Sequence, residues 1–266
     1  MATTCEKLHS GGMIMVTLGK LSLGLFEYLD AAAVKDYCPN GLQVEGKKEI
    51  SKVITGVSAC MELFTAARDM GADAIVVHHG ILWDSGDKAI RGSMRERVKF
   101  LLDHDISLLA YHLPLDRHPE VGNNVQIAKA LGLVDLKPFG EYNGKSIGRS
   151  GQLAEAVSIE QFMDLVRSTI NGAARCHAFG PVEARHVAIC SGGCQQLFHQ
   201  AIKDGADVFI TGEDSEWIYH LAREENIHYV AAGHHASERF GPMALGEWIG
   251  ENMDVEVEFV DIPNPL

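Results

Sequence analysis

The chain has 266 residues, of which 46% are hydrophobic and 22% are charged, and its formal net charge at pH 7 is −13. This length and apolar content allow a sizeable buried core, in one large domain or in two lobes of ordinary size. The acidic balance argues against direct nucleic-acid binding, because contacts to a phosphate backbone need clustered Lys and Arg.

The N-terminal end of the chain has no regular pattern. Residues 1–14 show no hydrophobic periodicity and are expected to form a flexible tail. Residues 1–20 lack the layout of a secretory signal, and no apolar run reaches the roughly 18 residues that a spanning helix needs. We therefore expect a cytoplasmic protein without a membrane partner.

Regular elements are predicted from residue 18 onward. Apolar residues at helical spacing predict a helix over 18–34, and the turn sequence Pro39-Asn40-Gly41 then leads into a short strand at 42–44. Residues 53–57, 61–70 and 74–77 predict a strand, a helix and a strand. A helical connection of this length implies parallel strands joined by a right-handed crossover.

A second stretch, from Val187 to Ile210, repeats this unit at a constant offset. The matching residues are Cys60/Cys194, Leu63/Leu197, Phe64/Phe198, Ala67/Ala201 and Gly71-Ala72-Asp73/Gly205-Ala206-Asp207. The duplication predicts an α/β fold with two related lobes built from βαβ units, over residues 15–135 and 136–266. Because the Cys190–Cys194 spacing fits neither zinc ribbons nor redox sites, we interpret the cysteines as small buried residues.

The remaining predicted elements lie between and after the two copies. Residues 137–186 are rich in Gly at first and then predict an amphipathic helix over 159–170. Residues 255–260 alternate Val and Glu, which predicts a half-exposed strand.

Two adjacent histidines, His78 and His79, stand at the carboxyl end of a predicted buried strand. Ligand sites of parallel sheets gather outside these strand ends. Neighbouring side chains of a strand face opposite ways, but at its end, with Gly80 freeing the backbone, the two rings can address two different ions. The alternative is a packed histidine pair at a turn.

A histidine followed four residues later by an acid occurs once in each half, as His112/Asp116 and His234/Glu238. On a helix this spacing places both groups on one face, about 5 to 6 Å apart at Cβ. Because Pro114 lies inside the first pair, a turn is the alternative to a regular helix there. A surface His–Glu pair is the alternative for the second, and the recurrence of the spacing argues against it.

These residues form a mixed imidazole and carboxylate set that suits Zn, Mn, Fe, Co or Ni better than Ca or Mg. Five or six such ligands are about right for two ions that share a carboxylate. Two ions roughly 3.5 to 4 Å apart lower the pKa of a water between them, as in metal-assisted hydrolysis. The candidate metal ligands are His78, His79, His112, Asp116, His234 and Glu238.

Two further positions are candidates near this set. Glu213 occupies in the second copy the position of His79 in the first, so it is expected to face the same cavity as a general base or as a hydrogen-bond acceptor behind a ligand. A helix N-terminal acid explains it equally well. Ser191-Gly192-Gly193 lies where backbone N–H groups can receive a phosphate, but it lacks the P-loop pattern, so a tight turn is favoured.

Five motifs together resemble one known family, the Nif-three-like dinuclear-metal proteins, whose members are often called type II GTP cyclohydrolase homologues. The motifs are Pro39-Asn40-Gly41-Leu42-Gln43-Val44, His78-His79-Gly80, His112-Leu113-Pro114-Leu115-Asp116, Thr211-Gly212-Glu213 and Gly233-His234-His235-Ala236-Ser237-Glu238-Arg239. The likeness extends over about 18–265 and is weakest across 142–186.

The resemblance implies a two-lobed α/β subunit of the family's short form, in a toroidal homohexamer built as a trimer of dimers. It also implies two divalent ions in each subunit. By motif, His78 and Asp116 would hold one ion, His79 and His234 the other, and Glu238 would bridge both. His112 would be an added ligand or lie behind one.

Two classes of function remain open. The leading hypothesis is a dinuclear metal-dependent hydrolase acting on a nucleotide or another N-heterocyclic small molecule, with Glu238 and Glu213 as catalytic candidates. For GTP, the attacked atom would be the imidazole carbon of guanine; a phosphoesterase or amidase would use the same ions on another substrate. The alternative is a non-catalytic metal-binding oligomer for metal handling or protein assembly.

Overall fold

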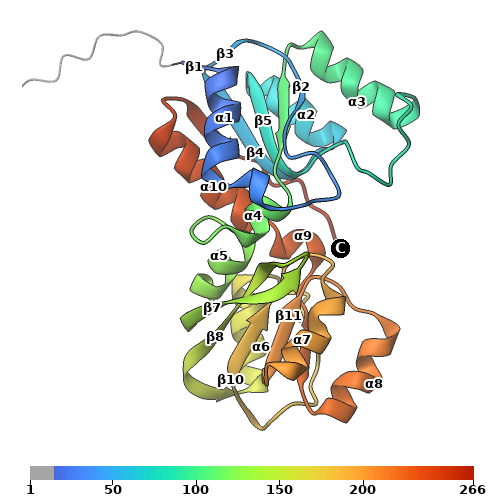
Figure 1. Cartoon of the computed structure of the whole chain (residues 1–266), viewed down its shortest axis with the longest axis vertical. Helices are drawn as coiled ribbons and strands as arrows, with labels where there is room; N and C mark the ends of the chain where they lie inside the picture. The colour runs from blue at the N-terminus through green and yellow to red at the C-terminus, as the bar shows by residue number, and fades with distance from the viewer. Residues whose placement is uncertain (1–14) are drawn as a thin grey trace, which may run out of the picture.

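The computed structural model describes residues 15–266, and the tail expected over 1–14 lies outside the described residues. Two large sheets organise this part of the chain, one in each of two lobes that lie one above the other in Figure 1, and β1 and β3 form a separate two-stranded sheet. Helices cover both faces of each large sheet. The predicted α/β fold is confirmed, and strand–helix–strand units lie at the centre of both sheets.

The upper lobe contains a five-stranded sheet and four longer helices. Its elements are β1 (Val16–Thr17), α1 (Leu18–Tyr28), η1 (Ala31–Ala33), β2 (Gly41–Val44), β3 (Glu49–Ile50), β4 (Lys52–Ser58), α2 (Met61–Asp69), β5 (Ala74–His79), α3 (Gly92–Asp103), β6 (Ser107–Ala110), α10 (Phe240–Asn252) and β13 (Glu256–Phe259). The strand order is β13-β4-β5-β6-β2, with only β2 antiparallel to its neighbour. Along β4, Val53 packs with α1 and α10 on one face and Ile54 packs with α2 and α3 on the other.

The lower lobe contains a six-stranded sheet of order β7-β8-β10-β11-β12-β9. Its elements are α5 (Asn123–Ala130), β7 (Val134–Tyr142), β8 (Lys145–Ser158), α6 (Ile159–Thr169), β9 (Arg175–His177), β10 (Glu183–Ile189), η2 (Gln195–Leu197), α7 (Phe198–Lys203), β11 (Val208–Thr211), α8 (Glu216–Glu225) and β12 (His228–Ala231). β10, β11 and β12 are parallel, β8 and β9 are antiparallel to them, and the edge strand β7 is antiparallel to β8. Two short helices, α4 (Leu113–Arg117) and α9 (His234–Ser237), lie at the junction of the lobes (Figure 1).

The expected boundary at residue 135 does not separate the two lobes, because segments on each side of it pack in the other lobe. Helix α5 lies before that boundary, but Ile127 and Ala128 pack in the core of the lower lobe. Strand β13 lies after it, but pairs with β4 in the upper sheet, and Leu245 and Ile249 of α10 pack in the upper core. Hydrophobic periodicity shows that a helix or strand buries one face, but not which sheet receives it.

The duplicated acids have the same structural role in both lobes. One Asp73 carboxylate oxygen accepts hydrogen bonds from the backbone N–H groups of Ser51 and Lys52, at 2.9 and 3.2 Å. Asp207 accepts in the same way from Arg185 and His186, at 2.8 Å each. Each acid directly precedes the second strand of its unit and binds backbone N–H groups in the first part of the preceding strand or just before it, so it ties the two strands together.

The long hairpin of β7 and β8 was not predicted from the sequence. Its tip is Asn143-Gly144, with φ of +48° and +75°, which is the arrangement of a tight two-residue hairpin turn. The helix expected over 18–34 ends instead at Tyr28, before Asp30 at φ +49°. Within residues 15–266, none of the helices is long and apolar enough to cross a membrane.

Candidate metal centre

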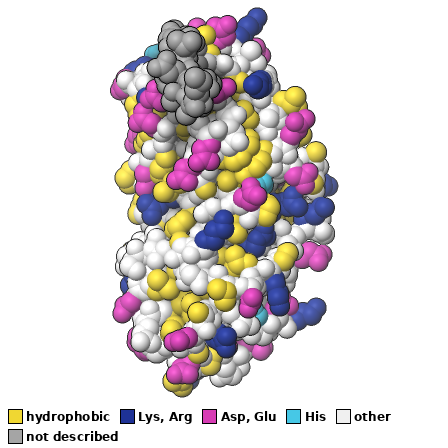
Figure 2. Space-filling model, turned by 90° about the vertical axis from the view of Figure 1, so that its left-hand side faces the viewer, with side chains coloured by type: hydrophobic (Ala, Val, Ile, Leu, Met, Phe, Trp, Pro, Cys, Tyr) yellow, Lys and Arg dark blue, Asp and Glu magenta, His cyan; other side chains and the backbone are white. Residues whose placement is uncertain are grey.

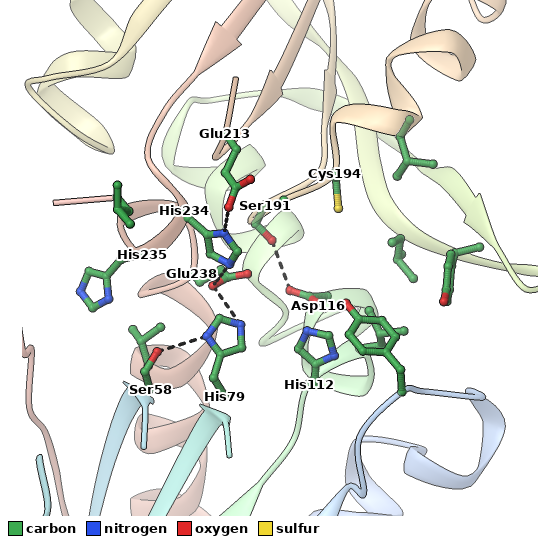
Figure 3. A pocket seen from close by; sticks show the side chains of 18 of the residues that line it. Ser58, His79, His112, Asp116, Ser191, Cys194, Glu213, His234, His235 and Glu238 are labelled. Carbon is green, nitrogen blue, oxygen red and sulfur yellow. Dashed lines mark hydrogen bonds and ion pairs between the residues drawn. The ribbon is translucent and has the colours of Figure 1, made fainter. Parts of the chain in front are cut away.

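The carboxyl ends of the parallel strands in both sheets meet at one pocket of about 740 Å³ (Figure 3). His79 ends β5 in the upper lobe, and His112 follows β6. Ser191 follows β10 and Glu213 follows β11 in the lower lobe. All four residues line the pocket, so the geometry of parallel sheets brings both copies of the repeat to one place.

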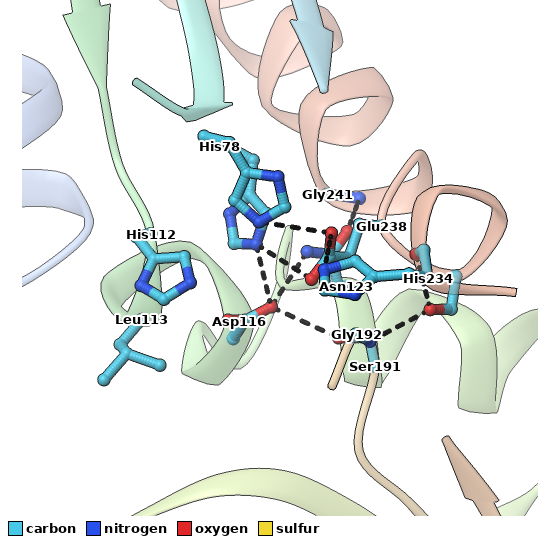
Figure 4. Close-up of polar contacts among 12 residues, drawn as sticks. His78, His112, Leu113, Asp116, Asn123, Ser191, Gly192, His234, Glu238 and Gly241 are labelled. Atoms are coloured by element: carbon cyan, nitrogen blue, oxygen red, sulfur yellow. Dashed lines mark hydrogen bonds and ion pairs between the residues drawn. The ribbon is translucent and has the colours of Figure 1, made fainter. Parts of the chain in front are cut away.

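Glu238 lies at the centre of a cluster of histidines and carboxylates in this pocket (Figure 4). Its Oε1 lies 3.4 Å from Nε2 of His78, which lies 3.6 Å from Oδ1 of Asp116. Its Oε2 lies 3.3 Å from Nε2 of His79 and 3.1 Å from Nε2 of His234. The two oxygens of one carboxylate therefore face two different donor groups. Each group has its candidate ligand atoms within 4.8 Å of one another, and the groups are His78, Asp116, Glu238 and His79, His234, Glu238.

Short helices at the lobe junction place the acids of both His-x3-acid pairs. His234 begins the one-turn helix α9 and Glu238 caps it, so the expected one-turn spacing is observed. Asp116 lies in α4, where Pro114 stands in the first turn and leaves the helix intact. The first pair therefore also rests on a helix rather than on an open turn.

Hydrogen bonds hold the histidine rings so that Nε2 remains free. Nδ1 of His78 contacts the Tyr111 carbonyl at 3.1 Å, and Nδ1 of His79 contacts Ser58 Oγ at the same distance. Nδ1 of His234 contacts Glu213 Oε1 at 2.6 Å. An acceptor behind Nδ1 is the usual arrangement for a histidine whose other nitrogen binds a metal. The neighbouring His235 instead directs its Nε2 to Asp261, at 2.8 Å.

Several features of the cluster fit a metal ion. Nε2 of His78 and Oε2 of Glu238 are buried without any hydrogen-bond partner among the described residues. Such atoms are costly unless something else satisfies them. Gly192 leaves room beside them, since a Cβ on it would lie 2.2 Å from Glu238 Oε1 and 3.3 Å from His234 Nε2. The donor set and the space around it therefore both fit bound divalent cations.

The electrostatics of the cluster point the same way. Burial lowers the pKa of His78, but the carboxylates of Asp116 and Glu238 outweigh burial and raise it to about 9. Burial likewise lowers the pKa of His234, but Glu238 and Glu213 outweigh burial and raise it to about 9. The carboxylates thus attract positive charge into a buried place. A bound metal would take the position of these protons.

Asp36 is a site residue that the sequence analysis missed. Its Oδ1 contacts Nδ1 of His112 at 3.0 Å, and its Oδ2 accepts from the backbone N–H of Leu113 at 2.9 Å and from Nδ2 of Asn40 at 3.0 Å. Burial raises the pKa of this carboxyl, but these hydrogen bonds, led by His112, lower it to about 2. Asp36 therefore fixes the His112 ring. Its only sequence signal was its position just before the Pro39-Asn40-Gly41 turn.

Two side chains hold the Asp116 carboxylate by hydrogen bonds that were not predicted from the sequence. Its Oδ1 accepts hydrogen bonds from Nδ2 of Asn123 at 2.9 Å and from Oγ of Ser191 at 3.2 Å. Ser191 belongs to the loop for which a phosphate site and a tight turn were both considered. Two of the backbone N–H groups in this loop are engaged internally, at Ser191 by Asn124 and at Gly192 by Ser237, as in a structural turn.

Glu213 lies behind His234 rather than at the centre of the cluster (Figure 3). Its Oε1 contacts Nδ1 of His234, and its Oε2 accepts from Nε2 of Gln195 at 2.8 Å. Of the two roles considered for it, this geometry favours the acceptor behind a ligand. Glu213 therefore holds the His234 ring through Nδ1, and Nε2 of this ring faces Glu238 at 3.1 Å.

Comparison with known proteins identifies the family of the chain. The family model for Duf34/NIF3 (NGG1p interacting factor 3) matches residues 16–265. The chain belongs to the DUF34/NIF3 family. A Pseudomonas aeruginosa relative named GTP cyclohydrolase 1 type 2 homolog is 46% identical over 239 residues, which cover 90% of this chain and 94% of that protein.

Solved structures of other DUF34/NIF3 members share the fold. The structure of the protein ybgI, described as of unknown function, is 43% identical, has a TM-score of 0.90 and is matched over 94% of this chain and 100% of its own. TTHA1606 from Thermus thermophilus is 32% identical, with a TM-score of 0.85 and the same coverage of both chains. The resemblance inferred from the five motifs is therefore confirmed.

Proposed function

We propose that this DUF34/NIF3 protein holds two divalent ions side by side, drawn from Zn, Mn, Fe, Co and Ni. His78 and Asp116 would hold one ion and His79 and His234 the other, with one oxygen of Glu238 on each. The observation that carries the proposal is the division of the Glu238 carboxylate between two donor groups. His112, fixed by Asp36, would serve as an additional ligand or a substrate contact at the edge of the cluster.

We further propose that the protein is a hydrolase for a nucleotide or a related N-heterocyclic small molecule. Two adjacent ions, when bound, polarise the attacked bond and activate water. The chain's own residues would keep the ligands in place: Glu213 orients the His234 ring, Asp36 orients His112, and Asn123 and Ser191 hold the Asp116 carboxylate. The pocket volume suits a ligand of nucleoside size, and relatives carry the name GTP cyclohydrolase 1 type 2 homolog.

The proposal also includes the assembly and location of the protein. By resemblance to the family, the subunit would form a cytoplasmic toroidal homohexamer, built as a trimer of dimers, with the pockets facing the central cavity. Sedimentation velocity of the metal-loaded protein would test the hexamer. A monomer or dimer at micromolar concentration would contradict it.

The reaction is tested by loading the purified protein with Mn, Fe, Ni or Zn and measuring formate release from GTP. We expect turnover with at least one metal and its loss in His234→Ala, with His199→Ala, outside the pocket, as the control. If no metal supports turnover, or if His234→Ala retains it, the cyclohydrolase activity is rejected. If removing the metal instead breaks up the oligomer and no small molecule is consumed, metal handling or assembly becomes the better account.

A further inference from the structure

Three aromatic side chains from separate segments stand together in the pocket wall. Tyr37 precedes β2, Trp83 follows β5, and Tyr142 ends β7 at the hairpin of the lower lobe. The ring of Tyr37 lies 5.9 Å from that of Trp83 and 6.5 Å from that of Tyr142, measured between centroids. We call these three residues the aromatic collar.

The collar is more exposed than large rings usually are. Tyr37 is 45% exposed and Tyr142 is 36% exposed, although both line a concave pocket. Scattered exposed aromatics need no explanation, but a group of them in a cavity marks a surface that a ligand or partner covers. Their faces are suited to stacking against a flat ring.

The collar is continuous with the candidate metal ligands. The Trp83 ring lies 5.8 Å from that of His79 and 5.3 Å from that of His112. The Tyr37 ring lies 5.0 Å from that of His112, in an edge-to-face arrangement. A flat molecule resting on the collar would therefore have an edge beside the cluster around Glu238.

The charges of the pocket exclude one familiar mode of recognition. Among the described residues, neither Lys nor Arg lines the pocket, whereas the carboxylates of Asp116, Glu213 and Glu238 do. Lysines occur near the collar in sequence, but they lie outside the lining, and Lys88 directs its amine to the Trp83 carbonyl at 2.7 Å. Apart from the proposed metal ions, a polyphosphate would thus find no cationic side chain in the pocket lining.

We propose that the aromatic collar binds an uncharged nitrogen heterocycle of nucleobase or nucleoside size by stacking, and that the side chains of the pocket do not recognise phosphate groups. This inference rests on the proposed function, because it names the substrate class of the same pocket. It goes beyond the name of the relatives, since the side chains of the pocket would bind the base and not the triphosphate of GTP.

The test compares guanosine and GTP as binding probes for the metal-loaded protein and for the metal-stripped protein, by calorimetry. In the metal-stripped protein we expect guanosine to bind at least as tightly as GTP, because the side chains of the pocket then offer the triphosphate no cation. The metal-loaded protein shows how much the proposed ions add for GTP. Tyr142→Ala should weaken guanosine binding about tenfold, the usual scale for loss of one stacking ring. Tyr219→Ala, a tyrosine that is 44% exposed on α8 and outside the pocket, is the matched control.

A spectroscopic measurement separates stacking from a general structural effect. Guanosine should quench the tryptophan emission of the wild type, and Trp83→Phe should abolish most of this quenching while retaining the metal content. Trp217→Phe, a tryptophan outside the pocket, should retain the quenching. If Trp83→Phe is quenched as strongly as the wild type, the collar does not stack on the ligand.

Other outcomes also overturn the inference. In the metal-stripped protein, one such outcome is GTP binding that is more than tenfold tighter than guanosine binding. If Lys35→Ala or Lys145→Ala weakens that binding, this chain recognises phosphate. A change in sedimentation of Tyr142→Ala with unchanged guanosine binding would make the collar a contact between subunits. The proposed function can fail on its own. If guanosine binds through the collar but no heterocycle is turned over, the hydrolase is rejected and this inference stands. If a heterocycle is turned over and Tyr142→Ala leaves its KM unchanged, only the collar is rejected.

Discussion

Replacing Glu213 by Gln tests whether a carboxylate outside the cluster controls one metal position and not the other. Glu213 Oε1 contacts Nδ1 of His234 at 2.6 Å, whereas His78 is supported by the Tyr111 carbonyl instead. The substitution keeps the shape and the acceptor oxygen but removes the negative charge behind the imidazole. Only the ion on His79 and His234 should therefore be weakened.

The expected magnitude follows from the exposure of this pair. Loss of a partner behind a metal-binding histidine usually costs 10- to 100-fold in metal affinity. The side chain of Glu213 is 45% exposed, so solvent screens its charge and the lower end applies. We expect about a tenfold loss for one ion, or about 1.4 kcal/mol, and an unchanged affinity for the other.

The assay is a titration of metal-free protein with Zn²⁺ against a chromophoric chelator, which resolves tight and weak binding steps. Glu216→Gln is the matched control, because Glu216 is an exposed glutamate three positions along the chain that does not line the pocket. Equal weakening of both steps, or no weakening of either, would refute the assignment of Glu213 to a single metal position.

Two further substitutions test the packing around the site and the role of the repeat. Gly192→Ala should reduce the metal content well below that of the wild type, because its Cβ would lie 2.2 Å from Glu238 Oε1. The control is Gly205→Ala, which should keep the metal, because Gly205 has a similar φ (+69° against +67°) but open space around it. Equal metal content in both variants, measured by elemental analysis, would contradict the close approach at Gly192. Asp73→Asn should cost about 1 to 3 kcal/mol of unfolding free energy at pH 7, measured in urea, because it removes charge-assisted hydrogen bonds at a buried position. Burial raises the pKa of Asp73, but the hydrogen bonds of Lys47 and Ser51 outweigh burial and lower it. The carboxylate therefore stabilises the fold above the unfolded pKa near 3.8, and this stabilisation is lost as pH falls through the lower folded pKa. The difference from wild type should accordingly shrink by pH 3. Exposed Asp69→Asn is the control, and a difference that stays constant with pH would contradict this reasoning.

The structure brings together residues that the sequence singled out from separate motifs, whereas their role as metal ligands stays a prediction. His78, His79, Asp116, His234 and Glu238 lie together in space because strand ends and one-turn helices leave distinct local patterns. Local spacing determines which side chains share a helix face or follow a strand. The structure brings all five into one cluster.

Other features depend on contacts between distant segments, which a single sequence does not reveal. Asp36 reaches His112 across 76 positions of the chain, and β13 pairs with β4 from the opposite end of the protein. The Asn143-Gly144 turn is different, since Asn-Gly between strand-forming residues is a known hairpin signal. That hairpin was predictable, and it matters because it carries Tyr142 to the pocket.

If the proposed function is right, Glu238 lies between two metal ions. The most direct measurement is an anomalous difference map from crystals of the metal-loaded protein, collected at the absorption edge of the metal. We predict two peaks per subunit on either side of the Glu238 carboxylate, one beside His78 and Asp116 and one beside His79 and His234. A single peak, or peaks away from Glu238, would contradict the account.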